Sequence, residues 1–235
     1  MPSALSEESL ARIVHLAKIN LRYLIYHGSE WINDYRYGID TRTSFRGIQS
    51  IDDLTVIGDR SGANPYAPSP FATVERVLKR LPADTSQYTF IDYGSGKGRV
   101  LVIAARRRFR EVIGIEFAEE LHRIAKRNIA SFRGVRRSPV RSVLCDATTF
   151  ELPPGPCVLF VYNSFTGLIM KKVADNVILS YRANPRHIMV AYYNPTVANA
   201  FEAGGHFRHT QTVTDGILSG LSHPRRYAAR ILEAF

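Results

Sequence analysis

Apolar residues recur at helical spacing in the first part of the chain and then lose that period. The apolar positions of residues 7–26 are Leu10, Ile13, Val14, Ala17, Leu21, Leu24 and Ile25. They predict an amphipathic helix over Glu7–Tyr26, with Ser6 as its N-cap. No period continues through Gly28–Gly62, which predicts a linker or loosely structured arm. Three prolines in ANPYAPSP (Ala63–Pro70) forbid regular structure, and a short helix is predicted over Phe71–Leu81.

From Tyr88 onward, apolar runs of strand length alternate with segments of helical period. The predicted strands are Tyr88–Tyr93, Glu111–Phe117, Val140–Cys145, Cys157–Tyr162 and Arg186–Tyr193. The predicted helices are Gly98–Arg108, Ala118–Phe132 and Leu168–Tyr181, with a further short helix beginning at Pro195. The strands are apolar throughout and do not alternate with polar residues, which is typical of a parallel sheet covered by helices on both faces.

The last part of the chain has a different pattern. HFRHTQTV (His206–Val213) and RRYAARILEAF (Arg225–Phe235) are strand-like runs without a convincing helix between them, and they predict an antiparallel pair at the edge of the sheet. The sequence therefore predicts an α/β fold built on a doubly wound, mostly parallel sheet. We expect two parts, an N-terminal helix and arm at residues 1–62 and an α/β domain at residues 63–235.

Composition narrows the functional classes only a little. Of the 235 residues, 45% are hydrophobic and 22% charged, which is ordinary for a globular domain. The polar start MPSALSEESL lacks the features of a signal peptide, and we expect a cytoplasmic protein with no membrane partner. The formal net charge of +10 favours an acidic partner such as nucleic acid, unless the arginines simply form a solvated surface.

The stretch FIDYGSGKGRVLVIAA (Phe90–Ala105) places three glycines on alternate positions after a predicted strand. Ligands of a doubly wound sheet bind beyond the carboxyl ends of its strands, and glycines let a ligand approach the main chain. A dinucleotide fingerprint needs a small residue where Arg99 stands, and a GxxxxGK[ST] phosphate loop is missing. Asp92 at the start of the loop would repel a pyrophosphate. We therefore expect a ligand with a cation and no phosphate here, and S-adenosylmethionine meets both conditions.

The next two predicted strands end beside acidic residues that extend this interpretation. Glu116, followed by Phe117, lies 22 residues after Gly94 and is placed to accept hydrogen bonds from both ribose hydroxyls. The third strand leads into Asp146 and Ala147, where a carboxylate can accept from the adenine amino group while the neighbouring N–H faces a ring nitrogen. Each position alone is also compatible with a turn or a helix cap, but together they favour a S-adenosylmethionine site.

These motifs resemble class I S-adenosylmethionine-dependent methyltransferases. The resemblance extends from about Pro65 to the C-terminus and is strongest in FIDYGSGKGRVLVIAA, EVIGIEFAEELHRIAKRNI and VLCDATTFELP. It implies a Rossmann-like, seven-stranded, mostly parallel sheet with an antiparallel C-terminal strand. It assigns Glu116 to the ribose and Asp146 to the adenine of the cofactor. The methionine end would lie against the loop residues Asp92, Tyr93, Gly94, Ser95, Gly96 and Gly98.

The acceptor of the methyl group is marked by weaker signals. The fourth predicted strand leads into Asn163-Ser164-Phe165, which resembles the (N/D)PP(Y/F) tetrapeptide of amino-group methyltransferases but is shorter and lacks both prolines. The stretch NPYAPSPFATVERVLKRLP is similar to a segment of protein-lysine methyltransferases and of a group of small bacterial methyltransferases, which would place Tyr66 in the pocket. A turn role for Asn163 and a buried anchoring role for Tyr66 are the alternatives.

The resulting hypothesis is a transferase that methylates nitrogen, with a protein lysine as the favoured acceptor and with Asn163 and Tyr66 as candidate catalytic residues. The alternatives are an RNA or DNA methyltransferase, in line with the basic charge, and a cofactor-binding scaffold without catalysis. Methyl transfer needs mainly positioning, because the sulfonium is already activated. His206 and His209 lack further ligands in their surroundings, so no metal site is predicted. The oligomeric state stays open.

Overall fold

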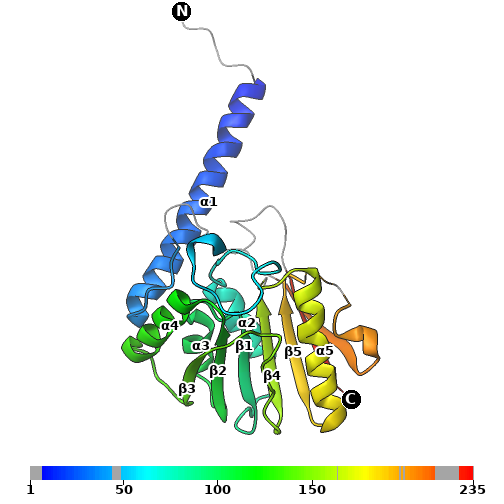
Figure 1. Ribbon diagram of the computed structural model, residues 1–235. Helices are drawn as coiled ribbons and strands as arrows, with labels where there is room; N and C mark the ends of the chain where they lie inside the picture. The colour runs from blue at the N-terminus through cyan, green and yellow to red at the C-terminus, as the bar shows by residue number, and fades with distance from the viewer. Residues whose placement is uncertain are drawn as a thin grey trace, which may run out of the picture.

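A seven-stranded sheet forms the centre of the protein (Figure 1). The computed structural model describes residues 7–43, 49–162, 164–195, 197, 199–214 and 228–234. In sheet order the strands are β3 (Val140–Leu144), β2 (Glu111–Glu116), β1 (Thr89–Tyr93), β4 (Cys157–Tyr162), β5 (Ile188–Tyr193), β7 (Ala228–Ala234) and β6 (Phe207–Thr214). All neighbouring pairs from β3 to β5 are parallel. The predicted α/β sheet is confirmed.

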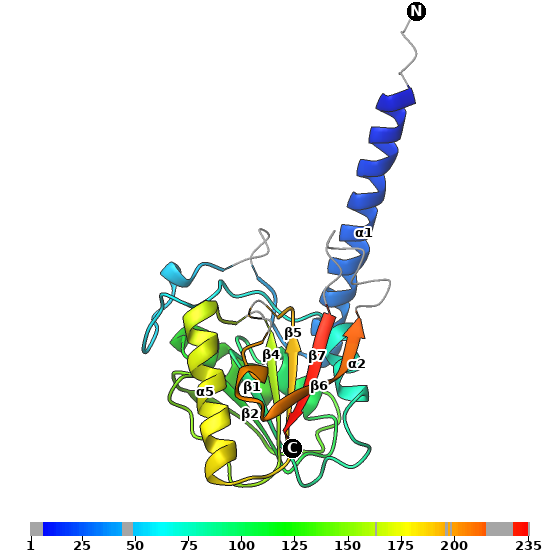
Figure 2. The same ribbon diagram turned by 90° about the vertical axis from the view of Figure 1, so that its right-hand side faces the viewer.

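Helices cover both faces of this sheet (Figure 2). On one face α2 (Phe71–Lys79), α3 (Arg99–Ala104) and α4 (Glu119–Ser131) pack together, and on the other face lies α5 (Gly167–Ala183). Successive strand residues contribute to opposite layers. Phe90 packs in the core under α2 and α3, whereas Ile91 packs in the core under α5. This burial on both faces explains why the strands are apolar without alternation.

The C-terminal strands close the sheet in a way that the sequence predicted only in part. The antiparallel pair forms, but β7 inserts between β5 and β6 and runs antiparallel to both, so that β6 is the edge strand. The α-helix predicted at Pro195 does not form among the described residues. Residues 196 and 198 lie outside them, and the described segment holds only the short 3₁₀ helix η2 (Glu202–Gly204).

The N-terminal helix is longer than predicted. It runs as α1 from Glu7 to Tyr37 and continues through Gly28, so the expectation of a linker from Gly28 onward is wrong for its first ten residues. A glycine inside a helix costs only about 1 kcal/mol and does not end it. Helix α1 ends at Tyr37 and is followed by Gly38, which has φ +66°. There Gly38 N–H donates to Tyr35 O and Ile39 N–H to Asp34 O, the paired bonds of a Schellman cap.

Most of α1 stands away from the sheet (Figures 1 and 2). Its C-terminal part lies beside α4 (Figure 1). In the described part of the chain, no helix combines the length and the apolar character needed to cross a membrane. After α1 the chain returns over the carboxyl ends of the strands, with one 3₁₀ turn, η1 (Ile51–Asp53), before α2 begins. The N-terminal helix predicted from the sequence is therefore confirmed, with its end moved from Tyr26 to Tyr37. The division into an arm at residues 1–62 and a domain at residues 63–235 stays a prediction.

Candidate functional site

A cavity lies at the carboxyl ends of β1, β2 and β4, where a doubly wound sheet binds its ligands. Seven of the residues predicted for the site line it, namely Tyr66, Asp92, Gly94, Ser95, Gly96, Glu116 and Phe117. Arg99, Tyr162, Ser164 and Phe165 line it as well, although the sequence had not assigned them to a ligand. The structure thus brings together the glycine loop and the acidic ends of two adjacent strands.

Asp92 places in this cavity a carboxylate whose Oδ2 lacks a hydrogen-bond donor among the described residues. The residue is only 2% exposed. Burial, and secondly the nearby Glu116, raise the pKa of Asp92 well above its ordinary value. A buried carboxylate that lacks partners is costly. A cationic ligand would supply both the missing donor and the countercharge.

Glu116 at the end of β2 is also buried, but its carboxylate is partly satisfied. One oxygen accepts from Gly96 N–H at 2.7 Å and the other from Ala118 N–H at 2.9 Å. Burial raises the pKa of Glu116 to about 7, although these backbone hydrogen bonds oppose the shift. The backbone N–H of Phe117 also stabilises the charged carboxylate. A carboxylate has about four acceptor positions, so capacity for a hydroxyl donor remains. The residue therefore retains the capacity predicted for ribose binding.

The glycine loop has the backbone that its sequence predicted. Gly94 and Gly96 have φ of +77° and +53°, a conformation that favours glycine. A Cβ on Gly96 would lie 2.2 Å from the Tyr66 ring, and one on Gly94 would lie 2.6 Å from the side chain of Ser164. Gly98 does not line the cavity. It is the N-cap of α3 with φ +82°, and a Cβ there would lie 3.1 Å from Ala125 of α4. Its assignment to the cofactor stays a prediction.

Residues 49–69 form a covering segment that lies over the cavity. Tyr66 is 9% exposed and its hydroxyl donates to Thr41 O at 2.7 Å. Burial raises the pKa of Tyr66, and Gln49 pairs with its backbone. Ile57 N–H donates to Phe117 O at the end of β2. These contacts support the anchoring role for Tyr66, which still presents its ring to the cavity.

Asp146 and Ala147, the residues predicted to bind adenine, do not line this cavity. Asp146 accepts from the backbone and the hydroxyl of Thr148, both at 2.8 Å. The main chain of Gly58, from the covering segment, lies against its carboxylate, because a Cβ there would be 2.2 Å from Oδ2. Ala147 is buried in the core beneath α5, as is Tyr93, and neither lines the cavity. Asn163 lies outside the described residues.

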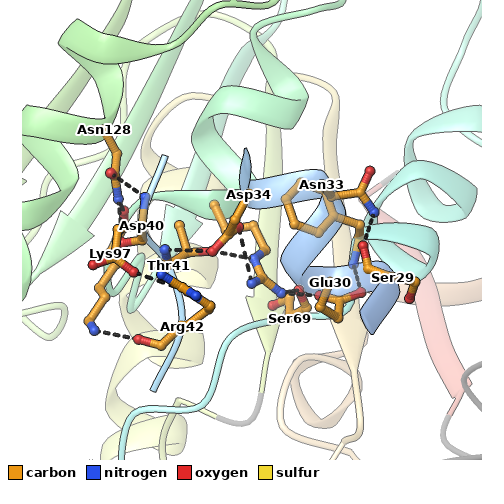
Figure 3. Close-up of polar contacts among 12 residues, drawn as sticks. Ser29, Glu30, Asn33, Asp34, Asp40, Thr41, Arg42, Ser69, Lys97 and Asn128 are labelled. Atoms are coloured by element: carbon orange, nitrogen blue, oxygen red, sulfur yellow. Dashed lines mark hydrogen bonds and ion pairs between the residues drawn. The ribbon is translucent and has the colours of Figure 1, made fainter. Parts of the chain in front are cut away.

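Arg99 is the main feature of the site whose role sequence reasoning missed. Its side chain is 3% exposed and forms ion pairs with Glu30 and Asp34 of α1. It also donates to Thr41 Oγ1 at 2.6 Å and Ser69 O at 3.1 Å. Figure 3 shows Glu30 and Asp34 of α1 close to Thr41 and Ser69. Glu30 and Asp34 have the four-residue spacing of one helix face, a signal hidden by the expectation of a linker.

Two further side chains bind the segment after α1 to the glycine loop (Figure 3). Lys97 Nζ donates to Arg42 O at 2.5 Å and lies 5.4 Å from the Tyr66 ring centre. Asn128 donates to Lys97 O and Asp40 O and accepts from Asp40 N–H, at 2.8–2.9 Å. The loop that faces the cavity is therefore held on its other side by the N-terminal arm.

The covering segment leaves little free space. The cavity volume is about 60 Å³, far below the roughly 300–1,000 Å³ typical of small-molecule pockets. A ligand as large as a nucleoside can enter only if Tyr66, Gly58 or more of residues 49–69 move. The structure is therefore a closed arrangement of the site.

Comparison with known proteins supports the fold. No family model and no curated protein sequence matches the chain. A solved RNA methyltransferase from Salinibacter ruber, in complex with S-adenosyl-L-homocysteine, is 20% identical over 72% of this chain and 94% of that chain, with a TM-score of 0.52. A S-adenosylmethionine-dependent methyltransferase from Leishmania major is 15% identical over 68% of this chain and 70% of that chain, with a TM-score of 0.50. The predicted class I methyltransferase fold is confirmed.

Proposed function

We propose that the protein is a S-adenosylmethionine-dependent methyltransferase that acts on nitrogen, with a protein lysine as the acceptor. The observation that carries the cofactor is the buried Asp92 carboxylate, which lacks a partner for Oδ2 among the described residues and lies beside a glycine loop. The amino group of the methionine end is the kind of donor that Asp92 needs. Ser95 Oγ is a second buried atom without a partner in that part of the chain.

Different residues of the cavity would bind different parts of the cofactor. Asp92 would hold the amino group, Gly94 and Gly96 would face the methionine end with bare main chain, and Glu116 would accept from the ribose hydroxyls. Phe117 supplies an apolar wall. When bound, S-adenosylmethionine supplies a methyl group already activated on a sulfonium, so the chain has mainly to position the acceptor.

The covering segment bears on the choice of acceptor. A lysine attacks only as the neutral amine, and an enclosed apolar site favours that form because desolvation lowers the pKa of an amine. Tyr66, Tyr162 and Phe165 line the cavity with aromatic surface. These aromatic side chains in the lining, and the similarity of residues 64–82 to a segment of protein-lysine methyltransferases, support this acceptor. Asn163 remains a candidate for orienting the nitrogen.

RNA is the second candidate acceptor, and charge is the observation that favours it. The chain carries a net charge of +10, and a shallow groove beside α4 is lined by Arg123, Lys126 and Arg127. Such a basic surface attracts phosphate. The groove lies outside the cavity that holds Asp92, so it would serve for docking and not for catalysis.

The test is transfer of a labelled methyl group from S-adenosylmethionine to a cell lysate, followed by separate protease and nuclease treatment. Label that protease removes and nuclease leaves supports the proposal, and lysine as the labelled residue completes it. Label that nuclease removes supports RNA. Cofactor binding without label in any macromolecule would contradict both and favour a scaffold or a small-molecule acceptor.

Two matched variants make this assay specific for the proposed site. Asp92→Asn changes the unpartnered carboxylate, whereas Glu111→Gln makes the same chemical change at the far end of β2, where Glu111 pairs with Arg141 on the surface. We expect Asp92→Asn to reduce the label strongly and Glu111→Gln to preserve it. Equal labelling by both variants would remove Asp92 from the site.

A further inference from the structure

Helix α1 exposes a row of apolar residues to solvent. Leu21, Leu24, Trp31 and Tyr35 are 58–79% exposed, and Val14 is 43% exposed. We define the apolar stripe as Val14, Ala17, Leu21, Leu24, Gly28, Trp31 and Tyr35. Its members follow one another at spacings of three, four, three, four, three and four residues. A strict three–four alternation is the heptad pattern by which helices pack against other helices.

The stripe lies on the opposite side of α1 from the contacts with the domain. Glu30 and Asp34 form ion pairs with Arg99 of the domain, and Tyr37 is buried in the core with α2. Each helical residue is rotated by about 100° from the last, so Leu21 lies about 180° around the helix from Glu30. Among the described residues, the domain therefore contacts one side of α1 and leaves the stripe exposed. The projection of α1 beyond the sheet leaves the stripe accessible to another chain (Figure 1).

The exposed area is large enough for a stable interface. Ile13, Ile25 and Ile32 flank the stripe and are 44–63% exposed. Together with the stripe residues Val14, Leu21, Leu24, Trp31 and Tyr35, they are eight large exposed side chains. At about 100 Å² each, these side chains expose on the order of 800 Å². The largest apolar patch of a typical monomer is roughly 300–600 Å². A standard interface buries about 800 Å² per partner.

We propose that α1 packs along its apolar stripe against α1 of a second copy of the chain. A two-fold contact between identical surfaces needs a self-complementary patch, and the stripe contains no charged residue. The whole helix carries four basic residues (Arg12, Lys18, Arg22 and Arg36) and four acidic residues (Glu7, Glu8, Glu30 and Asp34), so two paired α1 helices have no net charge with which to repel each other. This pairing is independent of the proposed methyltransferase activity.

A membrane surface is the competing occupant of an exposed apolar helix face. Helices that lie on membranes usually carry an excess of lysine and arginine on their polar face. The formal charge of α1 is zero, since four basic residues balance four acidic ones, and its apolar positions keep a three–four alternation over three heptads. Both features favour a helical partner over a lipid surface.

Sedimentation equilibrium of the full chain tests the pairing. The expected mass is twice the monomer mass of 26.5 kDa at micromolar concentration. The double variant Leu21→Glu/Leu24→Glu lowers the net charge by two and places charge in the stripe, and we expect it to sediment as a monomer. The control Arg12→Gln/His15→Glu lowers the net charge by two at exposed positions off the stripe, and we expect it to remain a dimer.

Circular dichroism should show that both variants stay folded, since the domain does not use the stripe. A monomeric wild type up to about 100 μM would overturn the proposal, as would a dimer that survives the stripe variant. Co-sedimentation with vesicles of phosphatidylcholine and phosphatidylglycerol tests the alternative, binding of α1 to a membrane surface. A monomer that binds these vesicles through the stripe would assign α1 to a membrane surface and also overturn the proposal.

Discussion

Replacing Arg99 with methionine should destabilise the protein far more than removing an ordinary surface arginine. The guanidinium is 3% exposed and faces the carboxylates of Glu30 and Asp34, which are 10% and 2% exposed. Burial already raises the pKa of Glu30, although Arg99 opposes the shift. Without the arginine, two buried carboxylates lose their countercharge and, among the described residues, keep only the donors of Thr41 and Phe71. Breaking a buried ion pair on one side costs about 3–5 kcal/mol.

Urea unfolding measures this cost, because the free energy of unfolding is obtained by linear extrapolation. The matched control is Arg141→Met. Arg141 pairs with Glu111 at 2.7 Å, but the two side chains are 52% and 31% exposed, and such a pair contributes only about 0–1 kcal/mol. Adding Glu30→Gln and Asp34→Asn to Arg99→Met removes the stranded charges and should recover part of the loss. A cost for Arg99→Met within about 1 kcal/mol of the control would refute this account of the network.

Three further changes test the cavity. Gly96→Ala should prevent binding of S-adenosylhomocysteine in calorimetry, because its Cβ meets the Tyr66 ring at 2.2 Å and φ is +53°, while Gly155→Ala, with no atom closer than 3.8 Å, should bind normally. Glu116→Gln should flatten the pH dependence of unfolding. The pKa of Glu116 is about 7 in the folded state and about 4.3 in the unfolded state, so the protonated carboxyl stabilises the fold. This contribution to the free energy of unfolding is fully present below about pH 4.3 and falls by roughly 3 kcal/mol up to about pH 7. The same pH profile in Glu116→Gln as in the wild type would exclude Glu116 as the source of the pH dependence. Tyr66→Phe should cost about 1 kcal/mol through the lost hydrogen bond to Thr41, and no loss in urea unfolding would contradict its anchoring role.

The sequence predicted the sheet well because burial dictates it locally. Strands such as β4 and β5 are covered on both faces, so their sequences are unbroken runs of apolar residues. The glycine loop and Glu116 were also predictable, because each lies directly at the end of such a strand. Parallel strands place their carboxyl ends at one edge, which brings the residues together without further information.

The arm was harder to predict because its contacts are distant in sequence. Arg99 was interpreted only as a residue too large for a dinucleotide fingerprint, yet its partners Glu30 and Asp34 lie 69 and 65 residues earlier. Gly28 suggested the end of a helix that in fact ends at Tyr37, just before Gly38, where the backbone turns left-handed. The covering of Asp146 by Gly58 depends on the same arm and left no local signal.

The central claim is that the cavity holds the methionine end of S-adenosylmethionine through Asp92. Calorimetric titration with S-adenosylhomocysteine, which keeps the amino group and is not consumed, tests this claim most directly. Loss of a hydrogen bond to a charged group costs about 1.5–3 kcal/mol, so we predict that Asp92→Asn weakens binding by roughly 10- to 150-fold while Glu111→Gln leaves it unchanged. Equal affinity of Asp92→Asn and the wild type, or no binding by the wild-type protein, would contradict the account.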